Sequence, residues 1–184
     1  FVSEHIWKSF SDPLLNLLSN HSETQLDLLE ARHALEGISA YFAALRGTEE
    51  DFARIQSSVL KISEAQEKHD FEAEASTVME FLIAITEATH NVVILHIVRS
   101  LAPLLEQNIL QNFKLLRHRP EAVEKVNKHR ANIVDAIVSG KPDTAREMSH
   151  SHLAYIEETL LELTREQSRR ERSLRRIQQG NEPQ

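Results

Sequence analysis

Residues 22–47, SETQLDLLEARHALEGISAYFAALRG, decide the fold class of this chain. Ser22 and Gln25 have the spacing of a capping box, and Gly47 is a common residue at the end of a helix. Between them apolar side chains recur with a 7-3-4-3 spacing, which keeps one face of a helix apolar. They are Leu28, Leu35, Ile38, Phe42 and Leu45. The stretch therefore predicts a helix with one face buried in a helical core.

The rest of the chain follows the same helical period. No stretch alternates between apolar and polar residues for long enough to predict a strand. We expect Pro103 to kink the fifth helix, or to lie in the first turn of a new helix capped by Ser100. The sequence predicts an all-α fold, an antiparallel bundle of six to seven helices. The expected segments are 14–18, 22–47, 48–62, 71–90, 92–113, 120–140 and 142–163.

Composition narrows the class of protein. The chain has 184 residues, enough for one domain, and its 4 Gly and 5 Pro leave few turns between long helices. It has no Cys, which excludes a disulfide scaffold, thiolate metal sites and a Cys nucleophile. The net charge of −7 argues against binding of a nucleic-acid backbone by this chain alone. No apolar run approaches the ~18 residues of a membrane span, so we expect a cytoplasmic protein without a membrane partner.

Residues 165–184 differ from the rest of the chain. Between Arg165 and Arg176 there are six Arg against two Glu, and apolar residues are too few for core burial. We expect a basic C-terminal helical extension and tail. It is either a solvated helix or a basic arm that docks on an acidic partner or on DNA phosphates.

Polar residues interrupt three of the apolar faces. Arg32, His129 and His152 each lie three or four residues from apolar neighbours of a predicted buried face. A buried arginine needs a partner, which could be Glu36, Glu106 or the carboxylate of a ligand. If the three faces converge, they predict a polar pocket inside the bundle that suits a small carboxylic acid. A satisfied core arginine in a purely structural dimerisation module is the alternative.

A metal enzyme is a second alternative. Glu87 and His90, and likewise Glu147 and His150, form the Glu-x-x-His motif of di-iron bundles, which also need a Glu from each of two further helices. His150 lies off the apolar face of its helix, which weakens this interpretation. The sequence contains neither a Gly-x-Ser-x-Gly motif nor a phosphate-binding Gly-rich loop, so we expect no enzyme activity. The two additional Glu residues that a di-iron bundle needs could be Glu36 and Glu106.

Several stretches resemble the effector domain of FadR-type regulators in the GntR family, the FCD domain. They are DLLEARHALE (27–36), with the family's Glu-x-Arg-x-x-Leu-Glu pattern, EATHN (87–91), and the closing segments HRANI (129–133), SGKPD (139–143) and AREMSHSHL (145–153). The resemblance implies a helical effector-binding and dimerisation domain over 11–164, which forms a homodimer. It also implies an N-terminal winged helix-turn-helix that binds DNA and lies outside this sequence, with 1–10 as a remnant of the wing and linker.

Within that family, other strings resemble the members that repress the pyruvate dehydrogenase complex. These strings are FVSEHIW (1–7), EARHALEGISAYFAALR (30–46), EATHNVV (87–93) and SRRERSLRR (168–176). This resemblance implies a repressor domain that binds pyruvate and thereby releases the protein from DNA.

The resemblance also implies a metal site, which this sequence keeps only in part. The family's ligands are an Asp and a His four residues apart on the fourth helix and two later His. The later two match His129 and His152, whereas the first pair falls on Val78 and Leu82, which cannot bind a metal.

We therefore expect a pocket that requires no metal or cofactor. In it Arg32 binds the carboxylate, and His129 and His152 hydrogen-bond the ligand. Asn108 and Asn112, four residues apart on the fifth helix, add amide contacts. A divalent metal bound weakly at the two His, or a metal-dependent sensor of another acid such as lactate, is the alternative.

Overall fold

The computed structural model describes the backbone of residues 24–180 and the side chains of 27–172. It consists of α2 (Thr24–Arg46), α3 (Glu49–Glu67), α4 (Phe71–Glu87), α5 (Val92–Leu116), α6 (Pro120–Val138) and α7 (Pro142–Gly180). No strand occurs between residues 24 and 180, so the all-α prediction is confirmed. The leader at 1–10, the short helix expected at 14–18 and the cap at Ser22 lie outside the described residues.

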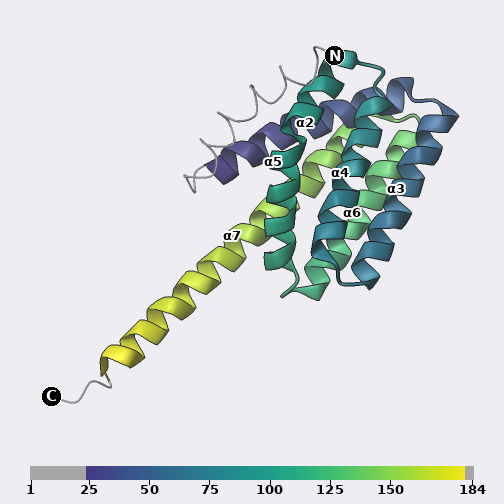
Figure 1. Ribbon diagram of the computed structural model, residues 1–184. Helices are drawn as coiled ribbons and strands as arrows, with labels where there is room; N and C mark the ends of the chain where they lie inside the picture. The colour runs from purple at the N-terminus through teal and green to yellow at the C-terminus, as the bar shows by residue number, and fades with distance from the viewer. Residues whose placement is uncertain (1–23, 181–184) are drawn as a thin grey trace, which may run out of the picture.

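The helices form two groups, one around the first part of α7 and one around α4 (Figure 1). The first part of α7 packs against α2 and α6, and α4 lies between α3 and α5. Contacts of α2 with α4, α5 and α6 join the two groups into one bundle. Because the connections between them are only three or four residues long, the packed pairs α3 and α4, α4 and α5, and α6 and α7 run antiparallel. The arrangement places α2 where its buried face meets four other helices.

Local sequence signals set several helix ends. The hydroxyl of Thr48 accepts a hydrogen bond from the Asp51 backbone, and the Asp51 carboxylate accepts one from the Thr48 backbone, which completes a capping box. Pro120 and Pro142 begin α6 and α7, as predicted. Of the two alternatives for Pro103, the new helix capped by Ser100 is wrong, because α5 continues through Pro103. Ser100 Oγ instead donates to the His96 carbonyl at 2.8 Å.

The core contains the apolar faces of all six helices. Its most deeply buried large side chains include Ile55, Ile62, Leu116, Ile137 and Leu153. The prediction that Leu45 lies on the buried face of α2 is wrong, since its side chain is 55% exposed. The buried positions there are small residues, Ala40, Ala43 and Ala44. The interior of the bundle is thus lined by alanines at this end of α2 rather than by the larger side chains.

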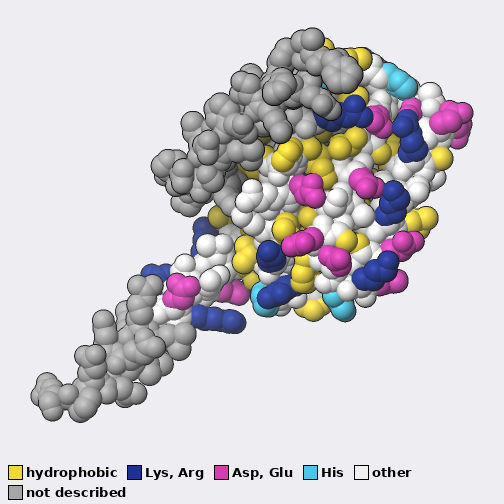
Figure 2. Space-filling view, in the orientation of Figure 1, with side chains coloured by type: hydrophobic (Ala, Val, Ile, Leu, Met, Phe, Trp, Pro, Cys, Tyr) yellow, Lys and Arg dark blue, Asp and Glu magenta, His cyan; other side chains and the backbone are white. Residues whose placement is uncertain are grey.

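Helix α7 extends beyond the bundle as a single helix (Figure 1). Every side chain from Thr164 to Arg172 is exposed, which supports the solvated helical extension. Arg119 contacts Glu162 and Glu166 where the helix leaves the bundle. Figure 2 shows Lys and Arg intermingled with Asp and Glu on the face seen there, without a large area of one sign.

Helix α5 is the one described helix that is long and apolar enough to cross a membrane by length and composition. The sequence expectation missed it because His96, Arg99 and Glu106 interrupt the apolar run. Leu104, Leu105 and Ile109 of this helix belong to the core of the bundle. Its apolar character is therefore explained in part by packing within the domain.

Candidate functional site

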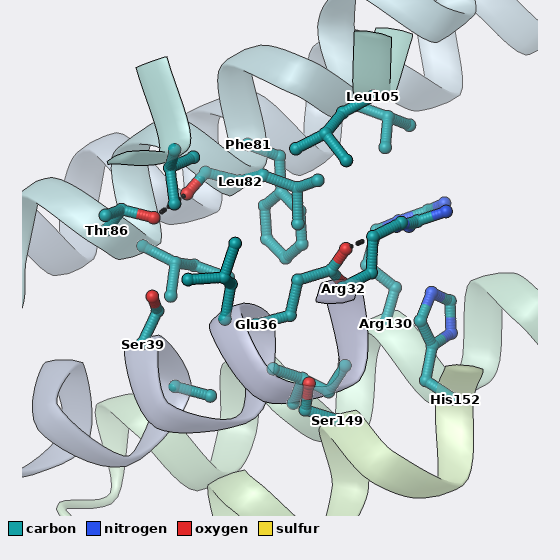
Figure 3. A pocket seen from close by; sticks show the side chains of 16 residues that line it. Arg32, Glu36, Ser39, Phe81, Leu82, Thr86, Leu105, Arg130, Ser149 and His152 are labelled. Atoms are coloured by element: carbon teal, nitrogen blue, oxygen red, sulfur yellow. Dashed lines mark hydrogen bonds and ion pairs between the residues drawn. The ribbon is translucent and has the colours of Figure 1, made fainter. Parts of the chain in front are cut away.

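A small cavity lies where α2, α4, α5, α6 and α7 meet (Figure 3). About 30 Å³ of it is open to the centres of water-sized molecules, which corresponds to two or three waters. One wall is apolar and comes mainly from α4 and α5. The polar side chains come from α2, α6 and α7, apart from Thr86 of α4. The polar side chains are Arg32, Glu36, Ser39, Thr86, Arg130, Ser149 and His152.

Arg32 is buried and already has partners. Its side chain is 3% exposed, and its Nε donates to Glu36 Oε1 at 2.6 Å. Its Nη1 points to Asn108 Oδ1 at 3.4 Å, and the Asn112 amide donates to that same oxygen at 3.2 Å. Of the two acidic partners that the sequence left open, the structure selects Glu36. Asn108 and Asn112 lie behind Arg32 and do not line the cavity.

Arg130 is a second buried arginine at this cavity, and sequence reasoning missed it. It is 4% exposed, and its Nη1 donates to Asn127 Oδ1 at 2.8 Å. No carboxylate of the described residues forms an ion pair with it. Burial lowers the pKa of its guanidinium to about 10, while the charges of Glu74 and Glu36 raise it. The group therefore stays positive at neutral pH without an ion-pair partner.

The sequence did contain a signal for Arg130. It lies four residues after Val126 and three before Ile133, while His129 lies three after and four before the same two residues. The spacing rule that selected His129 thus selects Arg130 equally. In the structure Arg130 is the more deeply buried of the two, and it is the one that lines the cavity.

Two buried polar atoms in the cavity wall have no hydrogen-bond partner in the described part of the protein. They are Ser39 Oγ and His152 Nδ1, on side chains that are 2% and 6% exposed. Burial, then the charges of Arg130 and Arg32, hold the pKa of His152 well below its usual value. His152 is therefore a neutral imidazole at pH 7. Buried polar groups normally have partners, so both atoms suit contact with a bound molecule.

His129 lies beside the cavity and not in its wall. Its ring centroid is 6.3 Å from that of His152 and 5.4 Å from that of Tyr155. Its Nδ1 is also buried without a partner. Burial and the charges of Lys125 and Lys128 lower the pKa of this imidazole. Among the predicted ligand-binding residues, Arg32 and His152 line the cavity. His129 lies outside it, against the ring of His152.

The family's metal does not fit the donors found here. Val78 and Leu82 are buried in the cavity wall, where the family has an Asp and a His. Within the described part of the chain, no group of three His, Asp or Glu could hold a metal ion. Two histidines beside an apolar wall supply half of the expected ligand set. The prediction of a metal-free pocket stays a prediction, and the residues present are consistent with it.

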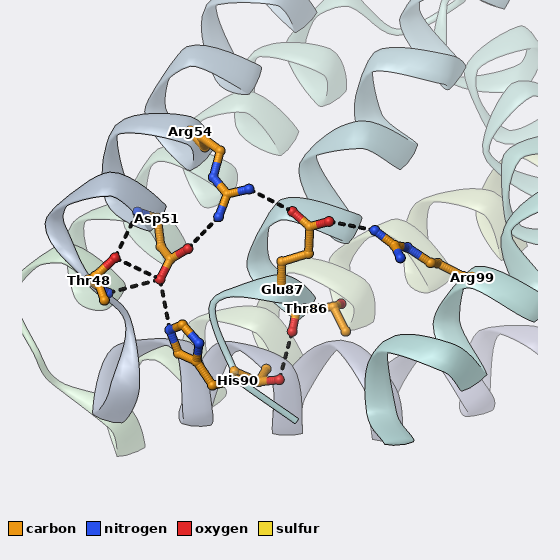
Figure 4. A network of polar contacts seen from close by, with 8 residues as sticks. Thr48, Asp51, Arg54, Thr86, Glu87, His90 and Arg99 are labelled. Atoms are coloured by element: carbon orange, nitrogen blue, oxygen red, sulfur yellow. Dashed lines mark hydrogen bonds and ion pairs between the residues drawn. The ribbon is translucent and has the colours of Figure 1, made fainter. Parts of the chain in front are cut away.

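The di-iron interpretation is wrong, because no group of three His, Asp or Glu among the described residues could hold a metal ion, and the motif residues have other partners. Glu87 accepts from Arg54 at 3.1 Å and from Arg99 at 2.6 Å. His90 contacts Asp51 at 2.9 Å in the same surface network (Figure 4). On the other motif, the Nδ1 atom of His150 lies 3.3 Å from Nδ1 of His33 on the surface.

Comparison with known proteins identifies this helical domain. The FCD domain family matches residues 27–155, which is well over half of the chain. The chain belongs to the FCD domain family of GntR-type transcription regulators. As an FCD domain it has an effector-binding role, and the resemblance to the GntR family is confirmed.

Named relatives of this FCD domain are bacterial regulators. The "Putative L-lactate dehydrogenase operon regulatory protein" of Escherichia coli K12 is 29% identical over 92% of this chain and 64% of its own length. The Glc operon transcriptional activator of the same strain is 30% identical over 82% of this chain and 60% of its own length. The chain thus spans less than two thirds of the length of these relatives. They are regulators and not enzymes, which confirms that expectation.

A solved structure supports the fold of the domain. The GntR protein of Streptococcus agalactiae superposes with a TM-score of 0.59 over 77% of this chain and 62% of that one, at 21% identity. At this identity the likeness shows the fold alone. It says nothing about the ligand of this FCD domain.

Proposed function

We propose that this FCD domain senses a small carboxylate, with pyruvate as the first candidate, and that binding releases the intact repressor from DNA. The observation that carries the proposal is Arg130, a buried guanidinium in the wall of a small cavity, without an ion-pair partner among the described residues. Burying a cation without an anion costs several kcal/mol, so a ligand carboxylate has a large gain available there. A guanidinium also matches a carboxylate through two parallel hydrogen bonds.

The remaining cavity wall suits a small keto or hydroxy acid. Ser39 Oγ and His152 Nδ1 are available for a second oxygen of the ligand. The apolar wall, which includes Phe81, Leu82 and Leu105, suits a methyl group. A few heavy atoms are all that the cavity accommodates without rearrangement.

The choice of pyruvate rests on resemblance. The strings FVSEHIW, EARHALEGISAYFAALR, EATHNVV and SRRERSLRR resemble the pyruvate dehydrogenase complex repressor of proteobacteria. The matched relatives carry names that refer to an L-lactate dehydrogenase operon and to the Glc operon. Lactate, with or without a metal at His129 and His152, is therefore the second candidate.

The intact protein would couple this site to DNA. GntR-family regulators bind DNA and small effectors and are usually dimers. We infer a cytoplasmic homodimer whose DNA-binding domain precedes residue 1. The ligand shifts the equilibrium between DNA-bound and released forms only by its difference in affinity for the two, typically about 1–3 kcal/mol.

A thermal-shift titration tests the proposal. Pyruvate, lactate, acetate and a divalent metal are each added to the wild-type chain, to Arg32→Gln and to Arg130→Gln, with and without chelator. A ligand at a hundred times its Kd adds about 2.7 kcal/mol of stability, which raises the Tm measurably. The matched control is Arg146→Gln, an exposed arginine that pairs with Asp143 on α7.

The expected result is a Tm increase with pyruvate that the chelator leaves unchanged. The increase is kept in Arg146→Gln and lost in folded Arg32→Gln and Arg130→Gln. An increase that requires the metal would replace the proposal by the metal-dependent sensor. No increase with any acid would contradict a carboxylate sensor.

A further inference from the structure

We propose that Glu36 limits the charge of the ligand, so that the cavity binds a monoanion and rejects a dianion of the same size. The inference rests on the proposed function and adds the charge class of the ligand. It starts from the groups that line the cavity and asks which of them carry charge.

The charged groups in the cavity wall are two cations and one anion. Arg32 and Arg130 are positive, and Glu36 is negative. His152 is neutral, because burial and the two guanidinium charges lower the pKa of its imidazole. Glu74, the other buried acid near Arg130, lies outside the wall and accepts a hydrogen bond from Gln66 at 2.7 Å. The wall therefore has one positive charge in excess, which one carboxylate neutralises.

Geometry assigns that excess charge to Arg130. Arg32 forms an ion pair with Glu36 and points its Nη1 to Asn108. Arg130 has a single described hydrogen bond, to the neutral amide of Asn127. Figure 3 shows the Glu36 carboxylate directed at Arg32. A ligand carboxylate would therefore bind mainly to Arg130, and His152 Nδ1, close enough to feel the Arg130 charge, would contact its neighbouring oxygen.

A second carboxylate on the ligand would find no cation without a counter-charge, because Arg32 is already paired with Glu36. It would meet either the Glu36 carboxylate or the apolar wall that includes Leu82 and Leu105. An anion buried against a like charge or without a partner costs several kcal/mol. Glu36→Gln removes the negative charge, keeps nearly the same shape and retains an oxygen that accepts from Arg32. This variant has two uncompensated cations and should prefer a dianion.

Pyruvate and oxalate are the matched pair of probes. Both are planar and have the same number of non-hydrogen atoms, but oxalate has a second negative oxygen in place of the methyl group. Isothermal titration at pH 7.5 and constant ionic strength, with EDTA present, gives the ratio of their Kd values. Wild type should bind pyruvate at least tenfold more tightly than oxalate. In Glu36→Gln the ratio should move at least tenfold toward oxalate.

Two further variants complete the test. Glu80→Gln removes an exposed acid that pairs with Lys61 on the surface, and it should keep the wild-type ratio. Arg130→Gln removes the excess positive charge and should lose pyruvate binding, which tests the charge assignment even if Glu36→Gln does not fold. Oxalate binding to wild type as tight as that of pyruvate would overturn the charge limit while leaving the proposed function intact. Binding of neither acid would overturn pyruvate as the ligand in the proposed function, and the charge limit with it.

Discussion

The Glu36 carboxylate accepts a 2.6 Å hydrogen bond from Arg32 Nε, one helical turn earlier on α2. Of the two buried guanidinium groups at this cavity, one is thus neutralised by its own helix. The other, Arg130 on α6, faces the same cavity and has no such partner. Because of this difference, we expect substitutions of Arg32 and of Arg130 to change the stability of the domain differently.

We expect Arg130→Met to keep or raise the stability of the ligand-free domain. A buried cation without an ion pair is unfavourable, and an apolar side chain of similar length often fills such a position at no cost or with a gain of about 1 kcal/mol or more. The same variant should lose the Tm increase with pyruvate. Urea unfolding with and without pyruvate measures both effects.

Arg32→Met is the comparison for that experiment. It leaves the Glu36 carboxylate without its partner and should cost about 3–5 kcal/mol. An equal loss of stability in Arg130→Met would mean that Arg130 has a structural role rather than a ligand-binding one.

We expect stability to fall as the pH drops below about 6.5, in part because of His152. The pKa of His152 is lowered in the folded state, so the unfolded chain binds a proton that the folded domain does not. The free energy of unfolding then decreases by up to about 1.4 kcal/mol per pH unit for this group. The lowered pKa values of His33 and His129 act in the same direction.

The free energy of unfolding should therefore change less steeply with pH in His152→Gln than in wild type, although the slope should not be zero. Urea unfolding between pH 5 and pH 8 measures it. His118→Gln changes an exposed residue of the α5–α6 connection and should keep the wild-type slope. A slope in His152→Gln equal to that of wild type would contradict a neutral, buried His152.

Asp51 should contribute stability that acid removes. Burial alone would raise its pKa, but hydrogen bonds from Thr48, Arg54 and His90 lower it to about 2. A carboxyl with a lowered pKa stabilises the fold above its ordinary pKa, and this contribution is lost as the pH falls through about 2. Asp51→Asn should therefore cost about 2 kcal/mol at pH 7, and the difference from wild type should shrink toward pH 2.

Denaturant unfolding of Asp51→Asn at pH 7 and near pH 2 measures this difference. Asp143→Asn is the control, since its carboxylate is 81% exposed and pairs with Arg146 on the surface. It should change stability by no more than about 0.5 kcal/mol. A cost of Asp51→Asn that is independent of pH would show that shape, and not charge, is what matters at this position.

Gly37 and Gly47 should respond in opposite ways to alanine. A Cβ at Gly37, inside α2, would lie 3.1 Å from Nε2 of the exposed His150, which can rotate away. The gain of about 1 kcal/mol for alanine over glycine in a helix should therefore be reduced but kept in part. A Cβ at Gly47 would lie 2.6 Å from the Ala43 carbonyl oxygen, which is backbone, and 2.5 Å from the Phe52 ring. Gly47→Ala should cost about 1–3 kcal/mol.

Thermal unfolding of the two variants, and of Gly37→Ala in a His150→Ala background, measures these effects. The gain from Gly37→Ala should be larger when the His150 ring is absent. The same gain in both backgrounds would show that the two side chains do not meet.

The sequence determined the helices and several of their ends, because these depend on neighbours within one turn. The helices expected to begin at 48, 120 and 142 begin at Glu49, Pro120 and Pro142 in the structure. The burial of Arg32 and His152 also followed from spacing, since both interrupt strongly apolar faces. Resemblance in short strings predicted the FCD domain.

Only the tertiary structure decided which polar residues meet. Arg130 and His129 satisfy the same spacing rule, and they differ by about 100° around α6, so only the packing of α6 against α2 and α7 places Arg130 in the cavity wall. The sequence likewise left the partner of Arg32 undecided, because it offered both Glu36 and Glu106 as candidates. Glu36 lies one turn from Arg32 on α2, and the packing of α5 places Asn108 rather than Glu106 next to the Arg32 guanidinium, which no single helix specifies.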